Sequence, residues 1–380
     1  MIRMVPTTDF PSPSAIARAS DSNEVLRNAI RDMLTAQWPS ESAVEASGSP
    51  ERRAAVLRQL GAQGWGSLGT DPEMGGMSAV VTCMEELGRA GCPAPLLEVV
   101  LINLALHDIK TSARVQLALE ALRTGHTSGC FALASFDGDA GAGRVSAHEV
   151  DDITSLSGNL AGVENAHDAS HIAVLLDTGA LAWVDVGTTA GLSIQATSGF
   201  AVPPLSRLMF DNVSAELIGL RPGLAADLAL LMRLGVTARA LGASRRGFDL
   251  VVDYAKQRVQ FGNPIGHYQA IQHKLVDCLI AIEGTRLLLL RAAVAWDMGD
   301  PLWRYATTSA VAFASPALRK SCLEIHHACG GIGFWEDHEM PRHFRRIHAD
   351  LLRFGGVHGA RAETAGRLLS NTELETTGHA

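Results

Sequence analysis

Two long helical patterns meet at a glycine and a proline near residue 262. Upstream, leucines recur at helical spacing over 223–256 beside many alanines and glycines, which predicts a helix that packs closely against its neighbours. Gly262 tolerates a positive φ, and Pro264 lacks an N–H and disfavours helix at the residue before it. We expect a second helix to start near Gly266, with free N–H groups and a positive dipole end close to Arg258. Such a helix start suits an anionic diphosphate, and the alternative is a helix hairpin with a surface arginine.

The composition excludes several classes of protein. The chain has 380 residues, enough for two or three domains, and a formal net charge of −8. Nucleic-acid and anionic-membrane surfaces need concentrated lysine and arginine, and the cluster of Arg342, Arg345 and Arg346 is too short to supply them. The sequence has no apolar run of bilayer length, and residues 1–22 lack the apolar segment of a signal peptide. We therefore expect a cytoplasmic enzyme with no nucleic-acid or membrane partner.

The cysteines are scattered and show no paired metal-ligand spacing. Reduced thiols in a cytosolic protein fit this distribution better than a disulfide framework does, so we expect neither disulfide bonds nor a zinc site. The six residues are Cys83, Cys92, Cys130, Cys278, Cys322 and Cys329.

The periodicity of apolar residues divides the chain into three domains. Helical patterns dominate residues 1–125, where the charges of 84–90 alternate in sign as on a surface helix. Residues 126–220 contain short runs with alternating apolar residues, punctuated by turns, which predict a β-sandwich or barrel. Helical patterns return over 221–380, with apolar stripes typical of an antiparallel bundle. The predicted strands are 130–134, 172–176, 180–184 and 207–210, and the predicted bundle helices are 275–290, 306–323 and 349–369.

We expect the C-terminal bundle to form an oligomer interface. The small residues of the 223–256 helix motivate this prediction, because they let helices approach closely.

With this order of helices, strands and helices, the chain resembles the acyl-CoA dehydrogenase family across nearly its whole length. The pattern Arg-x-x-Phe-Gly-x-x-Ile-x-x-x-Gln at 258–269 and the Gly-Gly-x-Gly-Phe turn at 330–334 are the strongest matches. Further matching segments, in the family's order, are 57–65, 73–76, 85–97, 156–158, 184–185 and 210–213. The resemblance implies an α+β fold with an N-terminal helical domain, a middle β-domain and a C-terminal helical bundle. It also implies FAD, acyl-CoA thioesters and α,β-desaturation.

That reaction needs a carboxylate base on the opposite face of the substrate from the flavin, because a Cα proton leaves while a hydride departs from Cβ. Relatives take this glutamate from a Tyr-Glu-Gly-Thr segment near the C-terminus, where this chain has Phe354 or Gly355. Other relatives take it from the helix before the Arg-x-x-Phe-Gly turn, where this chain has Met232, next to Arg233. None of these side chains accepts a proton, so the resemblance implies no catalytic residue here.

The middle domain departs from the family as well. Where relatives place Leu-Thr-Glu-Pro and Gly-Ser-Asp against the flavin, this chain has 133–141, which lacks those groups. Where relatives have an aromatic residue followed by Ile and then Thr or Ser before Asn, this chain has 161–165, with Glu164 before Asn165. The hydroxyls and the aromatic wall that hold the flavin ring are missing.

The surviving motifs are those that, in the family, cradle the diphosphate and adenosine of the FAD in the neighbouring subunit. Arg258 would pair with the diphosphate and Gln269 would reach the same cofactor. Phe261 and Ile265 would pack on the adenine side, and the glycines would allow close backbone approach. The full set of cofactor-binding residues implied is Arg258, Gln260, Phe261, Ile265, Tyr268, Gln269, His327, Gly330 and Gly331, with Gly333 in the same turn and His327 where relatives often have Gln.

The resemblance therefore favours the non-catalytic β subunit of a bacterial α2β2 acyl-CoA dehydrogenase in lipid metabolism. Relatives of that kind often act on bulky acyl-CoAs such as those of steroid degradation. Two alternatives stay open: a homomeric dehydrogenase with a relocated base, and a flavin-free structural or binding subunit of the same fold. Glu336, His348, Asp350 and Glu363 are the candidate relocated groups, each expected to be solvated or structural. Trp303 and Tyr305 are expected to be core or interface aromatics.

Overall fold

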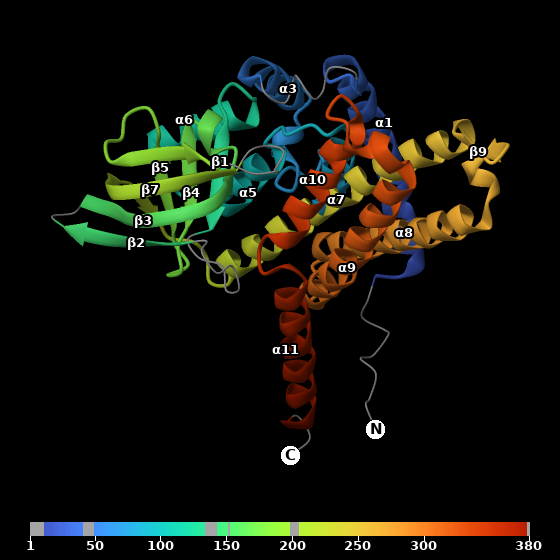
Figure 1. Cartoon of the computed structure of the whole chain (residues 1–380). Helices are drawn as coiled ribbons and strands as arrows, with labels where there is room; N and C mark the ends of the chain where they lie inside the picture. Colours follow the sequence, from blue (N-terminus) through green and yellow to red (C-terminus); the bar gives the residue numbers. More distant parts are fainter. Residues whose placement is uncertain (1–10, 41–48, 134–142, 151–152, 198–204, 378–380) are drawn as a thin grey trace.

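The structure is a computed structural model of the chain, and it describes residues 11–40, 49–133, 143–150, 153–197 and 205–377. Figure 1 shows the β-domain beside a large helical body, with helices from both ends of the sequence in that body. The α+β fold class predicted from the sequence is confirmed. The residue boundaries proposed for the domains stay a prediction.

Helices fill the described part of the chain before the first strand. Three of them begin with a serine, at Ser12, Ser49 and Ser112, whose side chain accepts a hydrogen bond from the first turn, the usual preference at a helix start. These helical segments are α1 (Pro13–Gln37), α3 (Pro50–Ala62), η2 (Trp65–Ser67), α4 (Met77–Ala90), α5 (Leu96–Leu106) and α6 (Ala113–Arg123).

The prediction of a surface helix at 84–90 is wrong, because the charges of α4 point inward. Glu85 and Glu86 are 7% and 2% exposed. Arg27 of α1 donates to both carboxylates at 2.9 and 2.8 Å, and Arg31 donates to Glu86 through two nitrogens. Helix α1 covers this face and supplies the opposite charges, so the carboxylates are buried as ion pairs.

The β-domain consists of two four-stranded sheets. One sheet has the order β1-β4-β5-β8, in which β1 and β4 are parallel, and the other has the order β2-β3-β7-β6 and is antiparallel. The four predicted strands correspond to β1, β4, β5 and β7, and four further strands were not predicted. The strands are β1 (Gly129–Leu133), β2 (Gly143–Val150), β3 (Ile153–Glu164), β4 (His171–Leu175), β5 (Leu181–Asp185), β6 (Leu192–Ala196), β7 (Leu205–Ser214) and β8 (Glu216–Ile218), with η3 (Ala166–Asp168) after β3.

The C-terminal part is a helical bundle. Its elements are α7 (Leu224–Gln257), β9 (Val259–Gln260), β10 (Asn263–Pro264), η4 (Ile265–His267), α8 (Gln269–Asp297), α9 (Trp303–Cys329), η5 (Gly330–Phe334), α10 (Glu339–Leu352) and α11 (Gly356–Thr377). The predicted apolar stripe at 349–369 belongs to two helices, because Phe354 and Gly355 take positive φ angles of 55° and 78° and separate α10 from α11. The described residues form no helix with the length and hydropathy of a membrane span.

The small residues of α7 are used for packing within the chain. A Cβ on Gly242 would lie 1.7 Å from the Glu85 carbonyl oxygen, and one on Gly88 would lie 1.9 Å from the Arg239 carbonyl oxygen. The backbones of α4 and α7 therefore meet at these glycines, as the sequence predicted for close helix packing. Because these glycines are buried inside the protein, they do not bear on the predicted oligomer interface, which stays a prediction.

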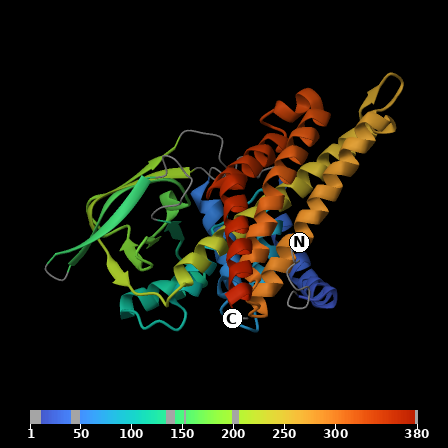
Figure 2. The same ribbon diagram turned by 90° about the horizontal axis from the view of Figure 1, so that it is seen from below.

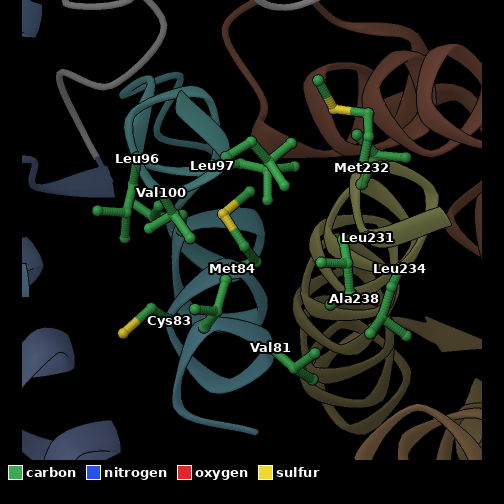
Figure 3. Close-up of a cluster of buried hydrophobic side chains, with 14 of the residues drawn as sticks. Val81, Cys83, Met84, Leu96, Leu97, Val100, Leu231, Met232, Leu234 and Ala238 are labelled. Carbon is green, nitrogen blue, oxygen red and sulfur yellow. The ribbon is translucent and has the colours of Figure 1, made fainter. Parts of the chain in front are cut away.

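Two apolar cores support this arrangement. The larger one joins the N-terminal helices to the bundle and includes the cluster between α4, α5 and α7 shown in Figure 3. The smaller one lies in the β-domain and contains side chains from both sheets, such as Ile172, Val184 and Leu208. Trp303 is 5% exposed and packs edge-on against Trp296, as expected of a core aromatic.

Candidate cofactor-binding site

The candidate turn forms a short β-hairpin between α7 and α8. Arg258 is the C-cap of α7, and Gly262 has a φ of 83°, the positive value predicted for it. Phe261 also takes a positive φ, of 52°, which side chains rarely adopt. Figures 1 and 2 both place this hairpin at the far end of α7 and α8 from the β-sheets. Helix α8 begins at Gln269, after the short η4, and not near Gly266 as expected.

The hairpin holds its shape through its own bonds and leaves its side chains outside. The Tyr268 hydroxyl donates to the Gln260 carbonyl oxygen at 2.9 Å, and the Ile265 N–H donates to the Arg258 carbonyl oxygen at 2.8 Å. The Phe261 side chain is 93% exposed. Within the described parts of the chain, the exposed guanidinium of Arg258 has no ion-pair partner. The turn therefore presents a free cation and an aromatic ring to whatever binds it.

The glycine turn lies at the same end of the molecule. Helices α8 and α9 are antiparallel neighbours, since the Lys274 ammonium pairs with Glu324 at 2.7 Å. The start of α8 therefore lies beside the end of α9, where η5 begins. Gly330 has a φ of 60°, and a Cβ on Gly330 or Gly331 would meet no atom within 4 Å. The backbone here is open to close approach by a ligand.

Other predicted members of this site are also accessible. Gln260, Gln269 and His327 are exposed. Ile265 and Tyr268 are half-buried at the base of the hairpin. Gly333 differs from the other two glycines, because a Cβ there would lie 3.3 Å from the Cys329 Cβ. It serves the packing of the turn, and the predicted contact surface is formed by Gly330 and Gly331.

The two positions of the expected base carry no acid in the structure. Phe354 is half-buried, with the Arg353 guanidinium 4.7 Å from its ring centroid. Met232 is 4% exposed and lies in the apolar cluster of Figure 3, which also contains Leu97 and Leu231. An ionised group at this second position would be strongly disfavoured by its surroundings.

The four alternative acid–base candidates are all engaged in other interactions. Glu336 binds Arg345 through both oxygens at 2.8 Å, and Glu363 accepts from Arg233 at 2.5 Å and from Arg367 at 2.7 Å. The ring Nδ1 of His348 lies 2.9 Å from the Phe344 carbonyl oxygen. The fourth, Asp350, is 2% exposed and binds Arg239. These contacts agree with the solvated or structural roles expected from the sequence.

Glu164 is the centre of a buried ion cluster that the sequence did not reveal. Its Oε1 accepts from Arg239 at 2.7 Å and from Arg346 at 3.2 Å, and its Oε2 accepts from Arg239 and Arg353 at 2.7 Å each. Arg239 also donates to both oxygens of Asp350, at 3.0 and 2.7 Å. The four acceptor positions of the Glu164 carboxylate are therefore filled from within the chain.

The charges of this cluster shift the pKa values of its members. Burial opposes ionisation of Glu164, but Arg239, Arg346 and Arg353 outweigh it and hold the pKa of that carboxyl far below its usual range. Burial, and then the charge of Arg239, lowers the pKa of Arg346 to about 10. The cluster therefore keeps the carboxylate of Glu164 ionised at neutral pH.

Glu98 of α5 is a second buried carboxyl beside this cluster. Its Oε1 accepts from the Asn165 side chain at 2.7 Å, and its Oε2 is buried without a hydrogen-bond partner in the described structure. Burial, and then the charge of Glu164, raises the pKa of Glu98 to about 7. The only sequence signal for it was a charged residue inside the apolar run of α5.

Comparison with known proteins shows similarity to one family. Residues 224–357, which contain both candidate turns, match the model of the acyl-CoA dehydrogenase C-terminal domain. The short-chain specific acyl-CoA dehydrogenase of Bos taurus is 28% identical over 92% of this chain and 91% of its own length. This chain is similar to acyl-CoA dehydrogenases over most of its length. Acyl-CoA dehydrogenase IpdE2 of Mycobacterium tuberculosis is also 28% identical, over 86% of this chain and 91% of that protein.

Solved structures share the fold over most of this chain. A variant of the Tcur3481–Tcur3483 steroid acyl-CoA dehydrogenase superposes with a TM-score of 0.82 at 26% identity, over 94% of this chain and 99% of that one. The ChsE4–ChsE5 complex of Mycobacterium tuberculosis has a TM-score of 0.80 at 24% identity, over 95% and 99% of the two chains. The second likeness, at this identity, concerns the fold alone.

Acyl-CoA dehydrogenases are FAD-dependent flavoproteins, so FAD is the cofactor that the turns and the expected ring position would have to fit. The hairpin and the glycine turn fit its diphosphate and adenosine, because they offer a free guanidinium, an exposed aromatic ring and open backbone. The residues at the expected ring position do not fit. Glu164 stands where the resemblance implies a hydroxyl, and its acceptors are saturated by arginines. The other expected ring contact, 133–141, lies outside the described residues after Leu133.

Proposed function

We propose that this chain is the non-catalytic subunit of a heteromeric acyl-CoA dehydrogenase and lends FAD contacts to a homologous catalytic partner. One observation carries the proposal. The chain exposes a turn fitted to the distal half of FAD, while both positions expected for a base hold residues that cannot accept a proton, Phe354 and Met232. Such a chain can support a flavin seated in its neighbour, although it cannot abstract the substrate proton by the family's route.

Each residue of the turn has a physical role in this proposal. Arg258 would form charge-assisted hydrogen bonds with the diphosphate, and Gln269 would donate to the same group. Phe261 and Ile265 would pack on the adenine. Tyr268 fixes the hairpin through its bond to the Gln260 carbonyl oxygen, so it would act on the cofactor through the hairpin backbone.

The glycine turn supplies the second half of this contact. Gly330 and Gly331 would let the backbone approach the cofactor, and His327 at the end of α9 would donate a hydrogen bond. Phe334 and Trp335, which follow directly, are 72% and 68% exposed. Large exposed aromatics of this kind are typical of surfaces that another protein covers.

The partner would dock on the bundle. Helix α8 exposes Val276, Ile280 and Leu287, and α9 exposes Phe313 and Leu323. The Phe313 ring lies 3.4 Å from the position of a Cβ on Gly284, so the apolar faces of the two helices adjoin. A face of this composition, on the helices that carry the cofactor turns, favours a homologous bundle as its occupant.

The likeness to the Tcur3481–Tcur3483 protein supports both the partner and the substrate class. That protein is a steroid acyl-CoA dehydrogenase whose name joins two components. By extension, we assign to this chain an α2β2 assembly and a bulky acyl-CoA substrate, such as a steroid side-chain thioester. The reaction would be α,β-desaturation carried out on the partner's flavin.

A second candidate function is a homomeric dehydrogenase with a relocated base. This alternative predicts that the isolated chain is yellow and active. The third alternative, a flavin-free structural subunit, predicts no flavin even when the partner is present.

The test replaces Arg258 in the assembled complex. Arg258→Ala should lose about 1.5–3 kcal/mol of cofactor binding, the range for hydrogen bonds to charged groups, which is roughly a tenfold to more than a hundredfold loss of affinity. Arg258→Lys should recover part of it, because an ammonium lacks the planar fork of a guanidinium. The measurement is the ratio of FAD to protein in the co-purified complex after dilution.

Arg207→Ala is the matched control, because Arg207 is an exposed arginine on β7, in the β-domain. It should leave the flavin content unchanged. If Arg258→Ala behaves like this control, the hairpin does not bind the cofactor and the proposal fails.

A further inference from the structure

The ion cluster around Glu164 joins parts of the chain that lie far apart in the sequence. Glu164 ends β3, Arg239 lies in the middle of α7, and Arg346 and Asp350 belong to α10. Arg353 follows α10 and lies 189 residues from Glu164 along the chain. The cluster therefore connects the β-domain to two helices of the bundle and to the loop that leads into α11.

We infer that this cluster is an interdomain lock, which holds the β-domain on the bundle without a cofactor at the expected ring position. The inference rests on the proposed function only for the position of the flavin ring. The lock itself follows from the contacts, because Arg239 binds Glu164 of the β-domain and Asp350 of the bundle with two hydrogen bonds each.

Because the cluster is buried, the loss of one of its members is costly. Glu164 and Asp350 have side-chain exposures of 4% and 0%, and that of Arg239 is 2%. Removing one partner of such a cluster leaves another charge buried and uncompensated, which is far more costly than losing an exposed ion pair. The lock is therefore sensitive to the loss of any one member.

The lock also has a consequence for the cofactor. A hydrogen-bond donor on a flavin ring would find the Glu164 oxygens already occupied, and opening them would break hydrogen bonds from Arg239, Arg346 and Arg353. The isolated chain should therefore be folded without flavin, and added FAD should not stabilise its β-domain.

The experiment uses the isolated full-length chain and the variant Glu164→Gln. We expect its midpoint of thermal unfolding to fall by at least about 5 °C, because a neutral amide cannot compensate the arginines. Glu336→Gln is the matched control. It breaks an exposed two-bond pair with Arg345 and should shift the midpoint by no more than about 1 °C.

Hydrogen exchange separates a lock from a general loss of stability. In Glu164→Gln, amides of β3 and β7 should exchange faster by at least roughly tenfold, whereas those of α8 and α9 should keep their wild-type rates. If Glu164→Gln does not fold, Arg353→Gln provides the same comparison, since Arg353 is the most exposed arginine of the cluster and leaves the Arg239 bonds in place.

Three results would overturn the inference: a midpoint shift equal to that of the control, equal acceleration in the bundle and the β-domain, or a rise of the wild-type midpoint by several degrees with about 0.1 mM FAD. The proposed function is tested separately. If the lock fails while Arg258→Ala still depletes flavin from the complex, only the lock is wrong.

Discussion

Glu98 is a buried carboxyl whose protonation the fold favours. It faces Asn165, which donates to it, and it lies within the electrostatic reach of Glu164 and Arg239. Burial, then Glu164, raises its pKa from the usual 4.5 to about 7. A folded-state pKa above the unfolded value means that the folded state binds the proton more tightly. The contribution of Glu98 to stability is therefore fully present below pH 4.5 and is lost as the pH rises through 7.

Replacement by glutamine should remove this pH dependence. Glu98→Gln keeps the shape and the acceptor for Asn165, so its stability relative to wild type should rise by roughly 3 kcal/mol between about pH 4.5 and pH 8. Urea unfolding at the two pH values measures the difference. The exposed Glu73→Gln is the control and should show the same difference at both pH values. A constant difference for Glu98→Gln would mean that Glu98 ionises normally.

Individual residues of the candidate turn could be identified from the sequence, and those of the ion cluster could not. Arg258, Gly262 and Gly330 lie in local patterns, where a glycine or proline fixes the backbone and a nearby arginine supplies charge. Glu164, Arg239 and Arg353 have no common pattern, because the cluster depends on which segments the fold brings together. The one available signal was a glutamate at the position where the resemblance implies a hydroxyl.

At the scale of elements, periodicity predicted the type of most helices and misjudged the surroundings of some. Helix α4 was predicted to lie at the surface because its charges alternate, but the arginines of α1 turn those charges into buried pairs. Strands β2 and β3 were missed because serine, glycine and asparagine interrupt their alternation. Pairing with a neighbouring strand along their length stabilises them, and that pairing is not a local property of the sequence.

The exposed apolar face of α8 leads to a prediction about assembly. Ile280 is 65% exposed in the single chain, so Ile280→Asp should change the stability of the isolated chain by no more than about 0.5 kcal/mol. In the complex it would bury an unpaired carboxylate, so we expect the affinity for the partner to fall at least about tenfold. Sedimentation of the co-purified subunits over a range of dilutions measures this loss.

Leu117→Asp provides the comparison for that experiment. Leu117 is 75% exposed on α6, in the N-terminal part of the chain and away from the bundle. The two variants introduce the same charge at exposed apolar positions of different faces. Equal behaviour of both in sedimentation would show that the partner does not use the α8–α9 face.

At the scale of the whole molecule, the proposed roles of the two subunits predict which preparation shows the yellow colour of flavin. The chain purified alone should be colourless and inactive toward acyl-CoA, because loss of a general base costs about 10²–10⁴ in rate and arginines of the chain occupy the Glu164 oxygens at the ring position that the resemblance implies. Co-expression with a homologous catalytic dehydrogenase should give a yellow complex. The visible spectrum of each preparation is the measurement, and yellow, active protein from this chain alone would refute the proposal.

The distance along the chain between the partners of Glu164 has a consequence for synthesis. The β-domain emerges from the ribosome well before α10, so the carboxylate of Glu164 has no arginine from that helix while the domain first folds. The charge of Glu164 is fully compensated only after α10 and the loop that follows it have been made. A chain that ends before α10 would keep an undercompensated carboxylate at the domain boundary. Incomplete products would therefore be recognisable by a β-domain that is not held on the bundle.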